Sequence, residues 1–229
     1  MIQDESGLCC EMVHELQNGL IILGGGGHAR VVRETLRALG WLGRVRGVVA
    51  LSMSEAEQAA LGLPCLGGDA VLAAWVGQGV ELINAVGSVG ATTRRRELYE
   101  RCRGMGLHFS TLIHPTAWLA GDVELGAGTQ LMARALVQSG VVVGENVLIN
   151  SGAIVEHDCQ LGAHAHVASG AVLSGAVRVG EGVHVGAGAV VRQGIAIGAG
   201  AVIGAGAVVV KNVREGAVVM GCPAGERVR

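Results

Sequence analysis

The sequence predicts an α/β plus all-β protein, in which a small Rossmann-like N-terminal domain precedes a left-handed parallel β-helix. Three observations support this prediction. An aliphatic residue recurs at every sixth position of the C-terminal half, and short apolar runs alternate with glycine turns and helical stretches in the N-terminal half. Glycine accounts for 39 of the 229 residues, while aromatic residues make up only 2%. A core with so few rings must consist of stacked small aliphatic side chains, which is typical of a repeat fold.

The six-residue repeat starts at Leu119 and continues without a slip. Three hexads form one triangular coil, in which the aliphatic side chain points inward and strands of neighbouring coils lie about 4.8 Å apart. A second small or apolar residue, four positions after each aliphatic, lets the chain turn the corner. We therefore expect a β-helix over residues 119–229, including a C-terminal tail. The aliphatic positions are Leu119, Leu125, Leu131, Val137, Val143, Ile149, Val155, Leu161, Val167, Leu173, Val179, Val185, Val191, Ile197, Ile203 and Val209.

A βαβ pattern occupies residues 19–105. Strand, glycine turn, helix and strand follow one another in the order typical of a parallel α/β sheet. We expect a connector at residues 106–118, where Pro115 disfavours helix in the residue before it. Residues 1–18 are expected to form a flexible leader. The predicted strands lie at 19–23, 45–51 and 80–86, and the predicted helices at 31–39 and 94–105.

Composition excludes several classes of protein. The net charge is −2, which provides no attraction for nucleic acid or for an anionic membrane. The N-terminus lacks the basic and then apolar pattern of a signal peptide. The uncharged run at 193–210 keeps the six-residue period and is rich in glycine and alanine, so we do not expect it to span a membrane. The six cysteines show no CxxC spacing, so we expect reduced thiols in a cytoplasmic protein.

Four motifs carry a family resemblance. They are GGGGHAR at 24–30, LIHPTA at 112–117, NSGAIVEHD at 150–158 and VVMGCPA at 218–224. Together they resemble the hexapeptide-repeat bacterial sugar O- and N-acyltransferases of the sialic acid O-acetyltransferase type. The resemblance implies a sugar-nucleotide-binding domain at 19–105, an acyltransferase β-helix, acetyl-CoA as co-substrate, no metal, and a homotrimer with active sites between adjacent β-helices.

His157 is the candidate general base. It lies two positions after the inward Val155, so its side chain leaves the prism, and an imidazole suits proton abstraction near neutral pH. The adjacent Asp158 is the candidate carboxylate that orients it. Adjacent residues on an extended chain point apart, so this contact requires a corner or a bulge. Gly175 lies one coil above His157, where its backbone N–H is a candidate oxyanion donor. The resemblance implies the same roles for His157 and Asp158.

The acetyl-CoA site is expected along the β-helix. Ser169, Ala187 and Ala205 repeat every eighteen residues, and a column of small residues would let the thin pantetheine arm run along the axis. The resemblance implies acetyl-CoA contacts for Ala187 and Ala205, and for His166 near the thioester. His184 lies one coil above His166, so we expect the two rings to stack, at a subunit contact.

The glycine turn is the candidate substrate site. Backbone N–H groups of Gly24, Gly25, Gly26, Gly27 and His28 at a helix N-terminus can hold a diphosphate. The spacing is not GxGxxG, so a nucleotide-diphosphate sugar fits through the resemblance better than a dinucleotide. The family often holds the nucleoside with acidic residues after the second strand. Residues 48–55 contain no aspartate, which leaves nucleotide binding open.

The leading hypothesis is therefore N-acetylation of a nucleotide-linked amino sugar for surface glycan synthesis. O-acetylation of a sialic acid or a similar sugar uses the same base and is the alternative. A zinc enzyme on the same β-helix would need three of the histidines at 157, 164, 166 and 184 to meet at one metal. A non-catalytic scaffold is the third alternative. The sugar, the nucleotide, the acyl length and the true start codon are left open by the sequence.

Overall fold

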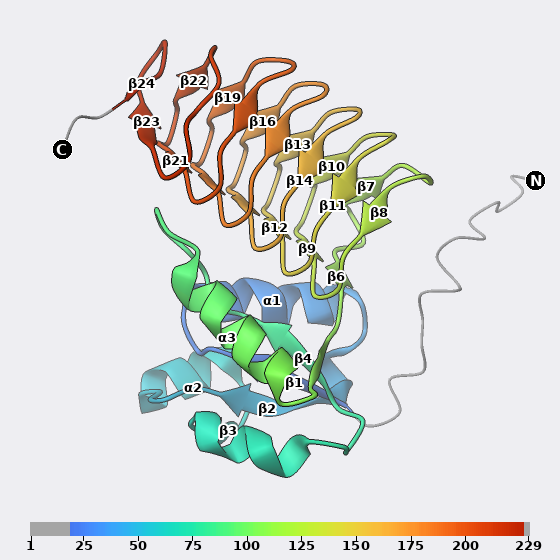
Figure 1. Cartoon of the computed structure of the whole chain (residues 1–229). Helices are drawn as coiled ribbons and strands as arrows, with labels where there is room; N and C mark the ends of the chain where they lie inside the picture. Colours follow the sequence, from blue (N-terminus) through green and yellow to red (C-terminus); the bar gives the residue numbers. More distant parts are fainter. Residues whose placement is uncertain (1–18, 227–229) are drawn as a thin grey trace, which may run out of the picture.

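A computed structural model describes residues 19–226. An α/β domain at the N-terminus packs against the side of a β-helix (Figure 1). The predicted leader at 1–18 and the last three residues lie outside the described part of the chain. In residues 19–226 no helix is long and apolar enough to cross a membrane.

The α/β domain is a parallel five-stranded sheet in the order β3-β2-β1-β4-β5, with helices on both faces. One face is covered by α1 and α2 and the other by α3 and η2, because each helix buries an apolar stripe on the sheet. The strands are β1 (Leu20–Leu23), β2 (Val45–Val49), β3 (Cys65–Gly67), β4 (Glu81–Asn84) and β5 (His108–Phe109). The helices are α1 (Gly27–Ala38), η1 (Leu42–Arg44), α2 (Glu55–Leu61), η2 (Asp69–Trp75) and α3 (Thr93–Gly104).

The β-helix consists of three sheets of short strands. The first contains β7 (Trp118–Leu119), β10 (Leu136–Val137), β13 (Ile154–Val155), β16 (Val172–Leu173), β19 (Val190–Val191) and β22 (Val208–Val209). The second contains β8 (Glu124–Leu125), β11 (Val142–Val143), β14 (Gln160–Leu161), β17 (Arg178–Val179) and β20 (Ala196–Ile197). The third contains β6 (Leu112–Ile113), β9 (Gln130–Leu131), β12 (Leu148–Ile149), β15 (His166–Val167), β18 (His184–Val185), β21 (Val202–Ile203), β23 (Val218–Met220) and β24 (Gly225–Glu226).

The predicted hexad frame is confirmed. Val137 pairs with Val155 and Val155 with Leu173, so neighbouring coils are eighteen residues apart in parallel register. From Leu131 onward every predicted inward aliphatic is buried in one continuous core. Corners are tight: a Cβ added to Gly144 would lie 2.6 Å from the backbone N of Ala163 in the next coil. The N-terminal α/β prediction is confirmed as well.

Residues 106–118, predicted as a connector, contain two complete strands and the first residue of β7. β5 completes the edge of the α/β sheet, and β6 pairs with β9 in the third sheet of the β-helix. The buried Leu112 of β6 also packs with the core of the α/β domain. The segment therefore joins the two parts by belonging to both, and the repeat begins one hexad before Leu119.

Candidate active site

His157 and Asp158 form a hydrogen-bonded pair at an exposed corner. The corner lies between β13 of the first sheet and β14 of the second, and Asp158 adopts the left-handed conformation with φ 59°. Its backbone N–H donates to the Ser139 carbonyl in the preceding coil. This bend lets the adjacent side chains meet, with His157 Nδ1 2.8 Å from Asp158 Oδ2. An Nδ1–H donated to the carboxylate leaves the Nε2 lone pair free to accept a proton.

Gly175 lies directly against the His157 ring. A Cβ added to Gly175 would lie 2.4 Å from His157 Nε2, so only glycine leaves room for the imidazole here. The next residue ties the two coils together, since the Ala176 N–H donates to the His157 carbonyl. Among backbone hydrogen bonds of residues 19–226, the Gly175 N–H donates to no carbonyl. This N–H is therefore not engaged by the backbone of the described residues.

His166 and His184 stack as predicted, but against the α/β domain. Their rings lie edge to face at 4.9 Å, in register on the third sheet. Asn150 Nδ2 is 3.3 Å from His166 Nε2, and His166 Nδ1 is 2.7 Å from Oγ of Ser88, in the loop after β4. Burial, with help from nearby positive groups, lowers the pKa of His166 to about 3. The predicted stacking is thus seen within one chain, where the loop after β4 covers His166. The subunit contact expected at this place stays a prediction.

The small-residue column exists on the surface of the β-helix. Ser169, Ala187 and Ala205 are all exposed. Their coils are joined by hydrogen bonds from Gly188 N to the Ser169 carbonyl and from Gly206 N to the Ala187 carbonyl. The column is continuous along the axis, as the predicted acetyl-CoA path requires.

The glycine turn lines a cavity of about 470 Å³ at the carboxyl ends of β1, β2 and β4. Gly24, Gly25 and Gly26 contribute to its wall. Gly26 caps α1 without a side-chain hydrogen bond, and the first turn of α1 carries no acidic residue. The free N–H groups of such a helix end favour a phosphate.

His28 turns away from this cavity. Its Nε2 is 3.0 Å from Gln130 Oε1 on β9, and Gln130 Nε2 donates in turn to the Asn84 carbonyl. The amide of Gln130 therefore presents its oxygen to His28, which must donate from Nε2 as a neutral ring. Burial, and secondarily the charge of Arg95, lowers the pKa of His28 to about 4. His28 thus links the α/β domain to the β-helix. It does not line the cavity in which a substrate role was predicted for it.

Comparisons with known proteins place the chain in a family. Residues 19–102 match the PglD N-terminal domain, and residues 140–175 and 176–211 match the bacterial transferase hexapeptide (six repeats). PerB from Caulobacter crescentus, solved with CoA and GDP-perosamine, is 38% identical with a TM-score of 0.83, over 92% of this chain and 97% of that one. The acetyltransferase domain of PglB from Neisseria gonorrhoeae, solved with acetyl coenzyme A, is 34% identical with a TM-score of 0.82, over 92% and 99%.

The chain belongs to the hexapeptide-repeat acetyltransferases with a PglD N-terminal domain. It is an acetyltransferase, as the sequence predicted. WeeI from Acinetobacter baumannii, at 22% identity and a TM-score of 0.77, shares the fold. No curated protein matches the chain. The predicted hexapeptide-repeat sugar acetyltransferase is confirmed, with PerB and PglB among the similar proteins.

Arg95 is a buried residue near the cavity that could not be identified as a site residue from the sequence. Its side chain is buried in α3 and donates from Nη1 to the carbonyls of Asn84 and Val86, 2.6 and 3.1 Å away. Val86 lines the 470 Å³ cavity. Burial lowers the pKa of Arg95 to about 9. The only sequence signal was the run of three arginines, which reads equally well as a solvated helix face.

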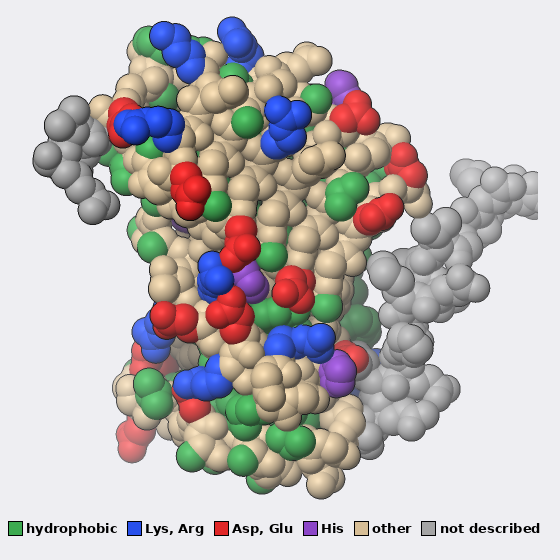
Figure 2. Space-filling model, viewed as in Figure 1, with side chains coloured by type: hydrophobic (Ala, Val, Ile, Leu, Met, Phe, Trp, Pro, Cys, Tyr) green, Lys and Arg blue, Asp and Glu red, His purple; other side chains and the backbone are tan. Residues whose placement is uncertain are grey.

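Charged side chains gather where α3 meets the β-helix (Figure 2). Arg96 pairs with Glu100 on its own helix and, at 2.6 Å, with Glu181 on the β-helix. Thr92 donates to the Gly182 carbonyl nearby. These contacts fix the loop after β4, and with it Ser88, against the third sheet.

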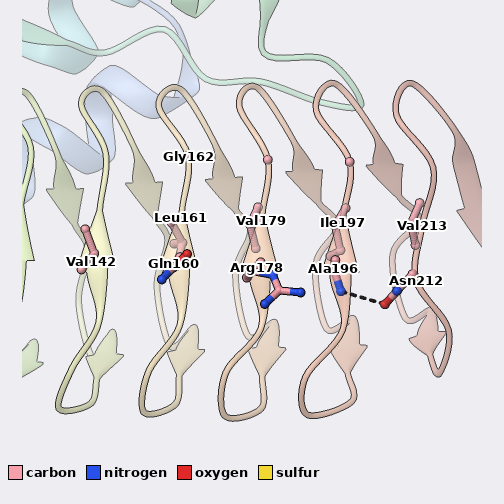
Figure 3. A pocket seen from close by; sticks show the side chains of 12 residues that line it. Val142, Gln160, Leu161, Gly162, Arg178, Val179, Ala196, Ile197, Asn212 and Val213 are labelled. Atoms are coloured by element: carbon pink, nitrogen blue, oxygen red, sulfur yellow. Dashed lines mark hydrogen bonds between the residues drawn. The ribbon is translucent and has the colours of Figure 1, made fainter.

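A second cavity, of about 510 Å³, lies on the outer face of the second sheet (Figure 3). Val142, Gln160, Arg178 and Ala196 are the outward residues of its strands. None of the predicted site residues lines it. The larger cavity is therefore not the centre of the predicted chemistry.

The histidines of the zinc hypothesis do not converge. His157 lies at the exposed corner, whereas His166 and His184 are buried on the third sheet and His164 Nδ1 contacts Asn146. Within residues 19–226, no three His, Cys, Asp or Glu side chains are grouped so that they could hold a metal ion. The four described cysteines, at 65, 102, 159 and 222, are free thiols.

Proposed function

We propose that this acetyltransferase moves the acetyl group of acetyl-CoA to the amine of a nucleotide-linked amino sugar, for surface glycan synthesis. One observation carries the proposal: His157, paired with Asp158, presents Nε2 beside Gly175, whose N–H donates to no carbonyl of residues 19–226. An imidazole base can remove the proton of an attacking amine, and a nearby backbone N–H can stabilise the oxyanion formed from the thioester. The PerB and PglB relatives, solved with CoA or acetyl coenzyme A, support the same donor.

The reaction moves one proton in two transfers, from the amine to His157 and from His157 to the coenzyme A sulfur, and exchanges one C–S bond for one C–N bond. As the amine nitrogen attacks the thioester carbon, His157 Nε2 accepts its proton and the Gly175 N–H stabilises the oxyanion. The C–N bond forms, the C–S bond breaks, and the proton leaves with the coenzyme A thiol. Asp158 holds the imidazole in the productive orientation and stabilises its protonated form.

The substrates are assigned to two places. Acetyl-CoA lies along the column of Ser169, Ala187 and Ala205, with His166 near the thioester as the family resemblance implies. The sugar diphosphate lies on the turn of Gly24 to Gly27, whose cavity at the end of α1 accepts an anion.

A homotrimer brings these places together. The corner of His157 lies between the first and second sheets, opposite the third sheet that packs on the α/β domain, and His157 does not line the 470 Å³ cavity. A neighbouring copy can supply the missing corner. The exposed Val142 and Val190 on two outer faces support such contacts. Free thiols and a CoA substrate support a cytoplasmic location. Light scattering should give a mass about three times the 23.2 kDa of one chain.

The test is thiol release from acetyl-CoA with a panel of acceptors. UDP- and GDP-linked 4-amino sugars are compared with free sialic acid, using wild type, His157→Ala and the control His108→Ala at an exposed histidine. Turnover with one amino sugar, lost only in His157→Ala, supports the proposal. Turnover with sialic acid alone favours O-acetylation, the alternative left open by the sequence. No turnover with any acceptor, or full activity in His157→Ala, overturns it.

A further inference from the structure

The end of β2 in this chain lacks the acidic residue by which sites of this α/β type commonly hold a ribose. β2 ends at Val49 and is followed by Ala50, Leu51 and Ser52, all of which line the 470 Å³ cavity. None of the three carries a charge that could accept hydrogen bonds from ribose hydroxyls. The sequence alone therefore left nucleotide binding open.

The neighbouring strand supplies a carboxylate at the same edge. β3 pairs in parallel with β2, ends at Gly67, and is followed after one residue by Asp69 at the start of η2. The two strand ends are held together, since the Ala50 N–H donates to the Gly67 carbonyl at 3.0 Å. A Cβ on Gly68 would lie 3.6 Å from Leu51 Cδ2. Asp69 thus stands beside the loop after β2, and it lines the same cavity.

The Asp69 carboxylate is held in place from α3. Oδ2 forms an ion pair with Nη2 of Arg101, which also lines the cavity. This leaves Oδ1 without a hydrogen bond to any residue of 19–226. A carboxylate with one oxygen fixed and the other open is prepared to accept a hydrogen bond from a bound ligand.

We propose that Asp69, held by Arg101, accepts hydrogen bonds from the ribose hydroxyls of the nucleotide sugar and replaces the missing residue after β2. The proposal rests on the proposed function, because it deepens the nucleotide site of the same cavity. The glycine turn and α1 N-terminus hold the diphosphate at one end of the cavity, and Asp69 holds the nucleoside at the other. Asp69 is a specificity-determining residue and takes no part in acetyl transfer.

The test separates ribose recognition from diphosphate binding. Calorimetry measures the Kd of GDP, UDP, their 2′-deoxy and 3′-deoxy forms, and inorganic pyrophosphate for wild type, Asp69→Asn and the control Glu55→Gln. Glu55 is exposed in the neighbouring α2 and does not line the cavity. Loss of a charge-assisted hydrogen bond should weaken the preferred nucleoside diphosphate by about 10-fold or more in Asp69→Asn. Pyrophosphate should bind wild type and Asp69→Asn equally.

The deoxy forms give the second criterion. Wild type should bind a 2′-deoxy or 3′-deoxy diphosphate more weakly than the parent, whereas Asp69→Asn should no longer distinguish them. The inference is overturned if Asp69→Asn binds GDP and UDP as wild type does, or if it loses pyrophosphate affinity to the same extent. Failure of the proposed function looks different: wild type itself would then acetylate no nucleotide-linked amino sugar.

Discussion

The imidazole of His157 occupies the space that a side chain on Gly175 would need. A Cβ at Gly175 would lie 2.4 Å from His157 Nε2, although the two residues belong to different coils. The eighteen-residue period placed them in one column, and the absent side chain leaves space for the ring next to Gly175. This relationship couples the identity of residue 175 to the position of the candidate base.

Gly175→Ala should impair catalysis without unfolding the protein. The backbone of Gly175 is not left-handed, so alanine fits it, and the exposed imidazole yields to the methyl group. Displacing a base by about 1 Å can cost about 100-fold in rate, and we expect kcat to fall by about that factor. Gly121→Ala, at the same position of its hexad with open space around it, should be neutral. Equal kcat in both variants would contradict the assignment of His157 as the catalytic base.

Asp158→Asn should lower kcat at least about 10-fold, because the neutral amide no longer supports the imidazolium formed during transfer. Asparagine tolerates the left-handed corner, so the thermal midpoint should change little. Arg134→Asn is the matched control, since Arg134 has φ 59° at the same hexad position. Steady-state kinetics at saturating substrates measure the effect. An active Asp158→Asn enzyme would leave Asp158 as a corner residue only.

Ala187→Leu should raise the KM for acetyl-CoA by about 10-fold or more, because a larger side chain blocks the column that leads along the axis. Ala187 is exposed, so stability should be unaffected. Ala199→Leu changes the same hexad position after the second sheet and should leave this KM unaltered. If both variants bind acetyl-CoA like wild type, the pantetheine arm follows another path.

The half-buried His28 should make the fold acid-sensitive. Its pKa is lowered from 6.5 to about 4 in the folded state, so the unfolded chain binds a proton that the folded chain excludes. The contribution of His28 to the free energy of unfolding is therefore fully present above pH 6.5 and is lost as the pH drops from 6.5 to about 4. At about 1.4 kcal/mol per pKa unit, His28 alone accounts for a loss on the order of 3 kcal/mol.

Urea unfolding at several pH values between 7.5 and 4.5 measures this loss. His28→Gln keeps a donor for Gln130 but cannot titrate, so the free energy of unfolding should fall less steeply with acid than in wild type. His108→Gln, at an exposed histidine, should follow the wild-type slope. Parallel slopes for His28→Gln and wild type would show that His28 titrates alike in both states.

The family and its chemistry could be predicted because their signals are local. The aliphatic at every sixth position specifies which side chains point inward, and the glycine turn after an apolar run specifies a strand followed by a helix. The contact of His157 with Asp158 was predicted conditionally, since it required a corner. Asp158 forms that corner in the left-handed conformation, which aspartate tolerates better than most residues.

The sequence by itself determined the coil register, the column of Ser169, Ala187 and Ala205, and the pairing of residue 175 with His157. These follow from a constant period, because a strict repeat converts sequence distance into spatial distance. Only the tertiary structure decided that His28 faces Gln130, that Ser88 covers His166, and that Asp69 lies beside the end of β2. Each of these contacts joins elements of different kinds with no common period, so their packing against one another, and not a local pattern, sets which residues meet.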